Sequence, residues 1–447
     1  MRRPLIAAAA TLLAAVAVLA GATSASAHVV PSTVLALDVH QHDITTELTL
    51  PTADLITASG IAIPEDGRAL SRTRAAKLAA YIEKHFHVSS ASDAWTVSVT
   101  NVVATATAQY GTGVFPAVTA VATLTPQDPE DLRSFTLDYT AIIHEVISAD
   151  IYVTLNSDWA AGQLDSARTL GTITLDTITG TIPTLHVNLN NGSLWQGFIG
   201  MVALGVAHIA QGTDHQLFLL TLLLPAPLLA VRRRWSGRVT PRRAVHHILS
   251  ITIAFTIAHS LTLALGTLGL PVPQQPIEAA IAASILVAAA HAIRPIFPGR
   301  EPLIAGLFGL IHGLAFSATL SALHLTGSQL VLSLLGFNLG IEAMQLTIVL
   351  LVLPPLVVLA RSVVYRPLRL IAATVTAIAA AGWLVDRVGF PNLVGTAANS
   401  LGTASVWIVL VLWSAAIITL VARRRPSRTH TTAEPSADVT RIERTNA

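Results

Sequence analysis

A short stretch near the middle of the chain, HIAQGTDHQLF over residues 208–218, places three ionisable side chains inside an otherwise apolar run. They are the imidazoles of His208 and His215 and the carboxylate of Asp214. Imidazole suits borderline divalent ions such as those of nickel, cobalt, zinc and copper(II), and a carboxylate adds neutralising charge. An ionisable group at membrane depth is costly unless it faces a partner or a cavity, so the stretch indicates a metal site, with a purely structural polar network as the alternative.

The spacing of the two histidines restricts how they can share one ion. On a straight helix His208 and His215 would lie on one face but about 10.5 Å apart along the axis. Nitrogens bound to one ion at about 2.1 Å must lie within about 4 Å of each other. We therefore predict a break at Gly212, which lets both histidines and Asp214 converge. Broken backbone at membrane depth is tolerated where it is buried in protein or lines a cavity.

Three later segments carry polar groups at helical spacing. SITIAFTIAHSLTLAL has a polar stripe that includes His259, and LFGLIHGLAFS has His312 inside a pair of glycines four residues apart, which favours close helix packing. In FNLGIEAMQL, Asn338 and Glu342 fall on one helix face. The candidate metal ligands are His208, Asp214, His215, His259, His312, Glu342 and Asn338.

Other histidines and carboxylates have plainer interpretations. His291 is as consistent with a packing role, and Glu278 with a solvated position near the outer surface. His246 and His247 follow a pair of arginines at a membrane interface and are interpreted as surface residues, with a role at an exit site as the alternative.

The composition excludes several classes. The 447 residues are 52% hydrophobic and 12% charged, which indicates a membrane protein, and the absence of cysteine excludes disulfide scaffolds and thiolate sites. No basic patch is interleaved with aromatic residues, so we expect no nucleic-acid partner. No GxxxxGK[ST] motif occurs, so direct ATP drive is unsupported. Copper(I) is disfavoured because soft sulfur ligands are scarce.

The amino terminus has the pattern of a secretory signal. Two arginines precede an apolar run that ends in Ala25-Ser26-Ala27, which predicts a signal peptide over residues 1–27 and a mature chain that begins at His28. An uncleaved signal anchor is the alternative. A free amino-terminal His28 could chelate a metal, and His40 and His42 would share one face of a strand, so a second-tier capture site is predicted there; a chance position of His28 is an equal alternative.

Residues 28–192 show period-two alternation rich in valine and threonine, which predicts an extracytoplasmic β-sandwich-like domain. One helix, residues 71–86, interrupts it, with Ser71 as N-cap. The predicted strands cover residues 33–39, 44–50, 95–108, 117–125, 135–142, 149–155 and 170–178.

From residue 193 to 425 the chain predicts an all-α polytopic membrane domain. Apolar runs cover residues 194–231, 244–268, 276–293, 302–320, 328–360, 368–385 and 403–422. Arginines cluster in every second connection, which makes those connections and the C-terminal tail cytoplasmic. The first run exceeds one span, yet its ends lie on opposite sides, so we predict a half-inserted or interfacial helix over 194–210, a break, and one full span from residue 214, giving seven crossings. The tail, residues 426–447, is predicted to be disordered.

At HIAQGTDHQLFLL, FTIAHSLTLAL, LFGLIHGLAFS and FNLGIEAMQL the sequence resembles the HupE/UreJ family of bacterial membrane proteins, in particular its longer branch with an extracytoplasmic N-terminal domain. The resemblance covers roughly residues 194–350. It implies permeation of nickel or cobalt, and the family's His-x5-Asp-His pattern falls on His208, Asp214 and His215. The pattern is similar to the His/Asp motif of the wider nickel/cobalt transporters, whose spacing differs by one residue.

These observations predict a divalent transition-metal permease of the bacterial plasma membrane. The metal is the substrate, nickel or cobalt first, with zinc and copper(II) open; no organic cofactor is expected. The expected partners are the lipid bilayer and the metal ion, and a homo-oligomer or a metallochaperone stays open. The rival classes are an intramembrane zinc-dependent hydrolase, in which Ser260 beside His259 could act, and a receptor or sensor whose outer domain binds a ligand.

Overall fold

The computed structural model describes residues 31–424 except 65–68, 91–92, 110–111, 165, 268–272, 400 and 403–404. The predicted signal peptide, His28 and the C-terminal tail lie outside these residues. The chain divides into two compact units. The first holds the described part of Met1–Gly205 together with Thr267 and Ser317–Gly340, and the second holds Val206–Gly266, the described part of Leu270–Phe316, and the described residues from Ile341 onward.

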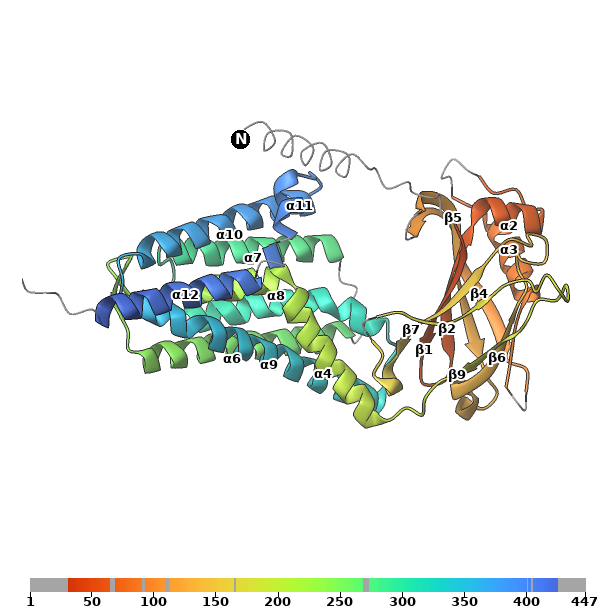
Figure 1. Ribbon diagram of the computed structural model, residues 1–447, viewed down its shortest axis with the longest axis horizontal. Helices are drawn as coiled ribbons and strands as arrows, with labels where there is room; N and C mark the ends of the chain where they lie inside the picture. Colours follow the sequence, from red (N-terminus) through yellow and green to blue (C-terminus); the bar gives the residue numbers. More distant parts are fainter. Residues whose placement is uncertain are drawn as a thin grey trace, which may run out of the picture. The chain divides into compact units, whose positions relative to one another are not determined.

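The β-rich part consists of two sheets (Figure 1). The larger sheet has the strand order β4-β5-β2-β1-β7-β8, with bounds Thr96–Gln109, Gly113–Thr125, Ile44–Pro51, Thr33–Val39, Ile151–Asp158 and Arg168–Ile173. β1 pairs with β2 antiparallel and with β7 parallel. The smaller sheet has the order β3-β6-β9, with bounds Phe86–Ser89, Ser134–Tyr139 and Leu185–Asn188. Every predicted strand is present, although β6 and β8 are shorter than expected.

One hydrophobic core is shared by both sheets and by two helices. Alternate residues of β1 are buried, as the period-two pattern requires, and Leu35 and Leu37 are fully buried. Helices α2 (Thr52–Ser59) and α3 (Arg72–Lys84) add Leu55, Leu78 and Ile82 to the same core. The Ser71 side chain accepts the N–H of Arg74, so the predicted cap of α3 is confirmed.

A tryptophan fixes the end of β7 to helices within the first unit. Trp159 opens a 3-10 turn, η2 (Trp159–Ala161), and its indole N–H donates to the Ser333 hydroxyl at 2.7 Å. A Cβ at Gly197 would lie 2.6 Å from the Trp159 ring, so the glycine is what allows the ring to pack there. The polar end of a buried indole needs such a partner, and Ser333 supplies it.

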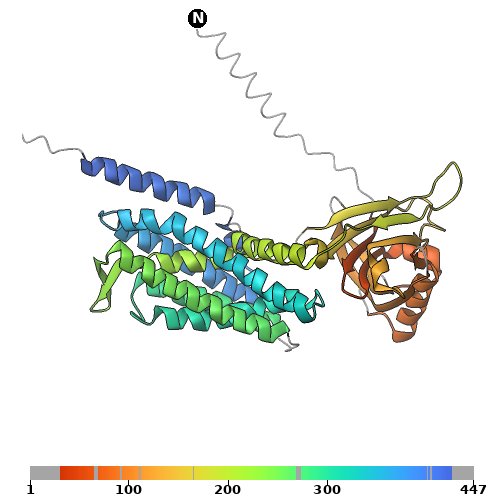
Figure 2. The same ribbon diagram turned by 90° about the horizontal axis from the view of Figure 1, so that it is seen from below.

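Apart from a short β-hairpin, the residues that the structure describes after β9 are mainly helical (Figure 2). The helices of this part are α4 (Leu194–Gln211), α5 (Thr213–Leu223), α6 (Pro241–Thr267), α7 (Gln274–Ile293), α8 (Glu301–Ser321), α9 (Gly327–Leu359), α10 (Tyr365–Arg387), α11 (Leu393–Asn399) and α12 (Ser405–Arg424). Among the described residues, seven helices are long and apolar enough to cross a membrane, namely α4, α6, α7, α8, α9, α10 and α12. The number of spans predicted from the sequence is the number found, and the protein is a multi-pass membrane protein.

The first of these spans differs from the expectation. Helix α5 has 11 residues, about 16 Å of length, which is too short to cross about 30 Å of hydrocarbon. The span predicted from residue 214 is therefore not one continuous helix, and of the two pieces α4 and α5 only α4 has the length and composition of a membrane span. The chain after α5 turns into a hairpin of β10 (Leu228–Val231) and β11 (Arg234–Arg238), because Pro225 and Pro227 interrupt helical hydrogen bonding.

Side chains from the hairpin and from α10 hold the C-terminal end of α7. The Trp235 indole donates to the His291 carbonyl at 3.0 Å. The buried Arg369 guanidinium donates to the carbonyls of Ala292 and Ile293, the last residues of α7. Carbonyls at a helix end lack intrahelical donors and carry partial negative charge, so a cation there stabilises the helix.

Candidate metal centre

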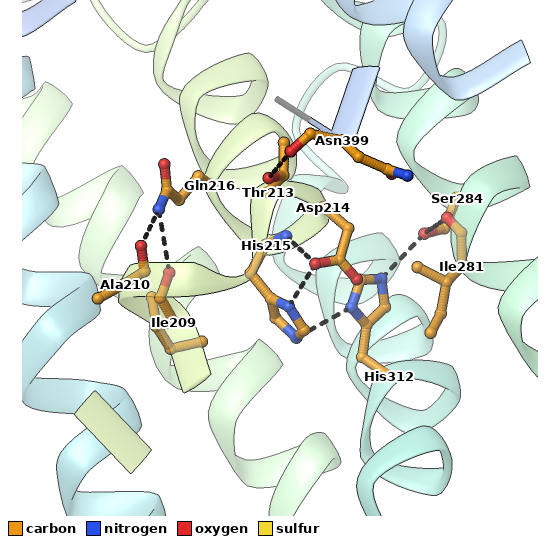
Figure 3. A network of polar contacts seen from close by, with 10 residues as sticks. All are labelled: Ile209, Ala210, Thr213, Asp214, His215, Gln216, Ile281, Ser284, His312 and Asn399. Atoms are coloured by element: carbon orange, nitrogen blue, oxygen red, sulfur yellow. Dashed lines mark hydrogen bonds and ion pairs between the residues drawn. The ribbon is translucent and has the colours of Figure 1, made fainter. Parts of the chain in front are cut away.

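The helix that carries the first motif is broken at the predicted glycine. α4 ends at Gln211, α5 begins at Thr213, and Gly212 between them has φ −70° and ψ 97°, outside the helical region. The Gln216 side-chain amide donates to the carbonyls of Ile209, at 3.4 Å, and Ala210 (Figure 3). It thus replaces backbone donors that the break removes, which is how interrupted helices are tolerated at membrane depth.

Gly212 has no room for a side chain. A Cβ there would lie 2.6 Å from the His208 carbonyl oxygen, 3.0 Å from His215 Nδ1 and 3.2 Å from an Asp214 carboxylate oxygen. The first of these is a backbone atom that cannot move aside cheaply. The glycine is therefore required by close packing of the motif on itself, while its φ is one that any residue adopts.

The break brings the two histidines of the motif together. The ring centroids of His208 and His215 lie 4.6 Å apart in an edge-to-face arrangement. A straight helix would separate the two residues by about 10.5 Å along its axis. The predicted convergence of the HIAQGTDH histidines is thus present in the structure.

A chain of contacts runs from α5 through α8 to α7 (Figure 3). The Asp214 carboxylate lies 3.0 Å from His215 Nδ1 and also accepts the His215 backbone N–H. His215 Nε2 lies 3.4 Å from His312 Nδ1, and His312 Nε2 lies 3.2 Å from the Ser284 hydroxyl. Ser284 donates to the Ile281 carbonyl at 2.7 Å, so it offers a lone pair to His312.

Two overlapping groups of side chains have the geometry of a metal site. Ligand atoms of His208, His215 and His259 lie within 4.8 Å of one another, and so do those of Asp214, His215 and His312. His215 belongs to both groups. His215, His259 and His312 are buried, whereas the Asp214 side chain is 33% exposed, so the site opens on its aspartate side.

Glycines on α8 let α6 approach and carry His259 into place. A Cβ at Gly313 would lie 2.2 Å from the His259 carbonyl oxygen, and one at Gly309 would lie 2.4 Å from the Phe255 carbonyl oxygen. The pair of glycines beside His312 thus works as predicted, by close backbone contact between helices. Aromatic rings pack beside the imidazoles. The ring centroids of Phe218 and Phe255 lie 5.5 Å and 5.4 Å from the ring centroid of His312.

Two predicted ligands lie outside these groups. Glu342 on α9 accepts the Thr256 hydroxyl at 2.7 Å, and Thr256 lies one turn before His259 on α6. Gln345 accepts from the same hydroxyl at 3.2 Å. The Asn338 amide donates to the Leu334 carbonyl of its own helix at 2.7 Å. The polar side chains of α9 thus bond to groups other than the histidines. Glu342 is linked to the cluster through Thr256, which lies one turn from His259 on α6.

The outer histidines differ from the expectation. His40 and His42 lie in the turn between β1 and β2, and not on a strand, because β1 ends at Val39 and the His40 N–H bonds back to the Asp43 carbonyl. His40 Nε2 lies 3.0 Å from the Thr45 hydroxyl, and its ring packs edge-to-face on His324. Burial, as the largest cause, lowers the pKa of His40 and so disfavours protonation of its ring. Neither residue belongs to a three-ligand group among the described side chains.

Some residues of the site were not singled out in the sequence. Ser284 lies mid-span on an apolar helix, and a lone serine there is usually bonded to its own backbone. Gln216 lies four residues after Gly212, and the need for a donor beside a broken helix was the available signal. The phenylalanines of the site are indistinguishable in sequence from ordinary lipid-facing or core residues.

Taken together, the seven apolar helices and the buried histidine cluster define a multi-pass membrane protein with a polar intramembrane centre. A model of the family described as HupE / UreJ protein matches residues 185–387. The match covers helices α4 to α10, so this part of the chain is similar to the family, and the β-rich N-terminal part fits the longer branch. The match implies membrane transport of a transition metal in general. No curated protein and no solved structure matches the chain.

Proposed function

We propose that the protein is a permease for a divalent transition metal, nickel or cobalt, which passes through the cluster at the broken helix. The observation that carries this proposal is the 3.4 Å distance between His215 Nε2 and His312 Nδ1. Two nitrogens bound to one ion at about 2.1 Å lie about 3.0 Å to 3.4 Å apart for angles from octahedral to tetrahedral. The two nitrogens therefore already lie at the separation that one shared metal ion requires.

The hydrogen bonds of His215 and His312 to their other neighbours favour the neutral tautomers that a metal ion requires. Because the Ser284 proton goes to the Ile281 carbonyl, the neutral His312 ring carries its proton on Nε2 and presents a lone pair on Nδ1. Asp214 accepts the Nδ1 proton of His215, which leaves a lone pair on Nε2. Two lone pairs then face each other at 3.4 Å, an arrangement that one shared cation stabilises.

Asp214 has the further role of orienting His215. A carboxylate behind a metal-bound imidazole fixes its tautomer and raises its basicity. His208 and His259 offer further nitrogens, and Glu342 and Asn338 are proposed as weaker ligands farther along α9. A set of donors made up of nitrogen and oxygen atoms suits nickel and cobalt, and also zinc and copper(II).

A cavity of about 350 Å³ provides access to the aspartate. Asp214 lines it, together with Thr213, Glu278 and Arg387. Arg387 pairs with Glu278 at 3.0 Å and with Asp386 at 2.9 Å. Carboxylates at such a mouth raise the local concentration of cations, and the arginine partners keep them from binding the ion tightly.

The orientation follows from the arginines. Short connections rich in arginine stay in the cytoplasm, so we propose that the β10–β11 hairpin faces the cytoplasm and that the β-rich domain lies outside the plasma membrane. The cavity at Asp214 is then on the outer side. Of the rival functions, hydrolysis gains little support, because the Ser260 hydroxyl donates to the Thr256 carbonyl at 2.7 Å and is held on its own helix.

Uptake into proteoliposomes tests the proposal. Wild type should accumulate radiolabelled nickel or cobalt, and His215→Ala and His312→Ala should abolish uptake because each removes half of the ligand pair. His186→Ala, on the β-rich domain, is a matched control that should transport normally. Undiminished uptake by both cluster variants would refute the proposed path, and bound metal without flux in wild type would favour the hydrolase.

A further inference from the structure

A second group of histidines and a carboxylate lies in the helical unit, away from the cluster. Glu301 begins α8 and is buried, although it is ionisable. His247 Nε2 on α6 lies 3.8 Å from Glu301 Oε2, and His291 Nε2 on α7 lies 3.5 Å from Glu301 Oε1. Glu301 Oε2 has no hydrogen-bond partner among the described residues. A buried, incompletely satisfied carboxylate is costly, so it points to a ligand.

The hydrogen bonds of His291 decide its role. Its Nδ1 accepts the backbone N–H groups of Ile296, at 3.1 Å, and Phe297, at 3.4 Å. A neutral ring that accepts at Nδ1 carries its proton on Nε2, so His291 directs an N–H at Glu301. His291 is thus a positioning residue for the carboxylate, while Oε2 and His247 Nε2 remain as potential ligands.

These groups face a cavity of about 530 Å³. Glu301, His246, His247 and His291 line it, and so does Arg243, whose positive charge opposes tight binding of a cation. Trp235 of the hairpin lines it as well. The cavity is large enough for a hydrated ion, and His247 is partly exposed, so the carboxylate is reachable.

The same three helices carry both groups of residues. From His312 to Glu301 along α8 is about 16 Å, and from His259 to His247 along α6 is about 18 Å. On α7, Ser284 contacts His312 and His291 contacts Glu301. The two groups of residues therefore lie at two levels of the same helix bundle, and the distance between the levels is similar along α6 and along α8.

Buried phenylalanines occupy the interval. Phe255 lies between His247 and His259 on α6, and Phe308 lies between Glu301 and His312 on α8. Phe218 of α5 contacts both, with ring centroids 5.4 Å from Phe255 and 5.8 Å from Phe308. Buried apolar rings between two polar sites oppose the passage of a hydrated ion.

We infer that Glu301 and His247 form an acceptor site, which receives the divalent metal ion after it has passed the three phenylalanines. The inference rests on the proposed function and assigns the step after the cluster. Two protein ligands, completed by water and opposed by Arg243, make a weaker site than the cluster. Weak final binding is what release from a conducting pathway requires.

Equilibrium binding of radiolabelled Ni²⁺ to the full-length protein in nanodiscs, paired with Ni²⁺ uptake, tests the site. Wild type should show a tighter and a weaker class of bound ion. Glu301→Gln and His247→Ala should each weaken the second class by about tenfold or more and slow uptake, with the tighter class unchanged. His247→Ala removes a partly exposed side chain, so it tests the site even if Glu301→Gln impairs folding. Glu145→Gln and His186→Ala, on the β-rich domain, are the controls.

The outcomes separate the two proposals. A second class that survives in both variants with normal uptake overturns the acceptor site and leaves the cluster untouched. His215→Ala should remove the tighter class and keep the weaker one. If His215→Ala instead changes neither class nor the uptake, the proposed function fails, whereas loss of the weaker class in Glu301→Gln would still support ion binding at Glu301.

Discussion

The imidazole rings of His208 and His215 lie 4.6 Å apart between centroids, although seven residues separate them on what would be a continuous helix. Gly212 makes this possible by ending α4 and starting α5 within one residue. Because of the break, the His215 ring contacts the His208 ring on one side and the His312 ring on the other, so that the three imidazoles are grouped together.

Gly212→Ala is therefore expected to disrupt the site. The added Cβ would meet the His208 carbonyl oxygen at 2.6 Å and His215 Nδ1 at 3.0 Å, and overpacking of this kind costs about 1–3 kcal/mol. We expect at least tenfold weaker nickel binding, measured by equilibrium titration, and a lower melting temperature. Gly306→Ala on α8 is the matched control, because its Cβ would meet only the Ala254 carbonyl oxygen at an ordinary 3.5 Å. Equal binding by the two variants would contradict the role given to Gly212.

Asp214→Asn separates charge from shape. The amide keeps the size of the carboxylate but loses the negative charge that holds His215 by its Nδ1 proton. Loss of such an orienting partner weakens metal binding by about 10- to 100-fold. Isothermal titration with nickel should report this loss with little change in the melting temperature, since the side chain is 33% exposed. Asp93→Asn, on the β-rich domain, should bind as wild type does; an Asp214→Asn protein that also binds as wild type would argue against the orienting role.

The fold and the site differ in how far the sequence predicts them. Alternation in TVLALDV and ITTELTL predicts β1 and β2, and apolar runs bounded by arginine clusters predict α6 to α10 and α12, because both patterns report burial directly. The convergence at Gly212 was predictable, since metal–ligand distances forbid a straight helix. The contact of His312 with Ser284, and that of His291 with Glu301, were not, because they depend on the rotation of α7 against α8, which no local pattern encodes. The hairpin at Leu228–Arg238 was missed for a related reason: its apolar first strand continues the helical run.

The β-rich domain should lose stability in mild acid. Burial, as the largest cause, lowers the pKa of both His40 and His85, so folding disfavours protonation of these rings. Unfolded histidine binds a proton at about pH 6.5, so the stability these groups provide is complete above that pH and is lost as the pH falls toward their folded pKa values. Hydrogen exchange of the full-length protein, corrected for intrinsic rates, should show less protection of β1–β3 at pH 5.5 than at pH 7.5. The double variant His40→Gln/His85→Gln should show a smaller difference; an unchanged difference would assign the effect to other groups.

The proposed orientation can be tested with single cysteines, since the native chain has none. Ser236→Cys lies in the exposed strand β11 of the arginine-rich hairpin, and Ala322→Cys lies in the exposed connection between α8 and α9. A membrane-impermeant maleimide applied to intact bacterial protoplasts should label Ala322→Cys at once and Ser236→Cys only after permeabilisation. The reverse pattern would invert the proposed topology.

The position of a bound ion tests the proposed metal site most directly. Crystals of the full-length protein soaked in cobalt, with diffraction recorded at the cobalt absorption edge, should give an anomalous peak about 2.1 Å from both His215 Nε2 and His312 Nδ1. A weaker peak beside Glu301 would accompany it if the acceptor site is occupied. Binding of cobalt elsewhere in the protein, with no peak between His215 and His312, would contradict a metal site at this histidine pair.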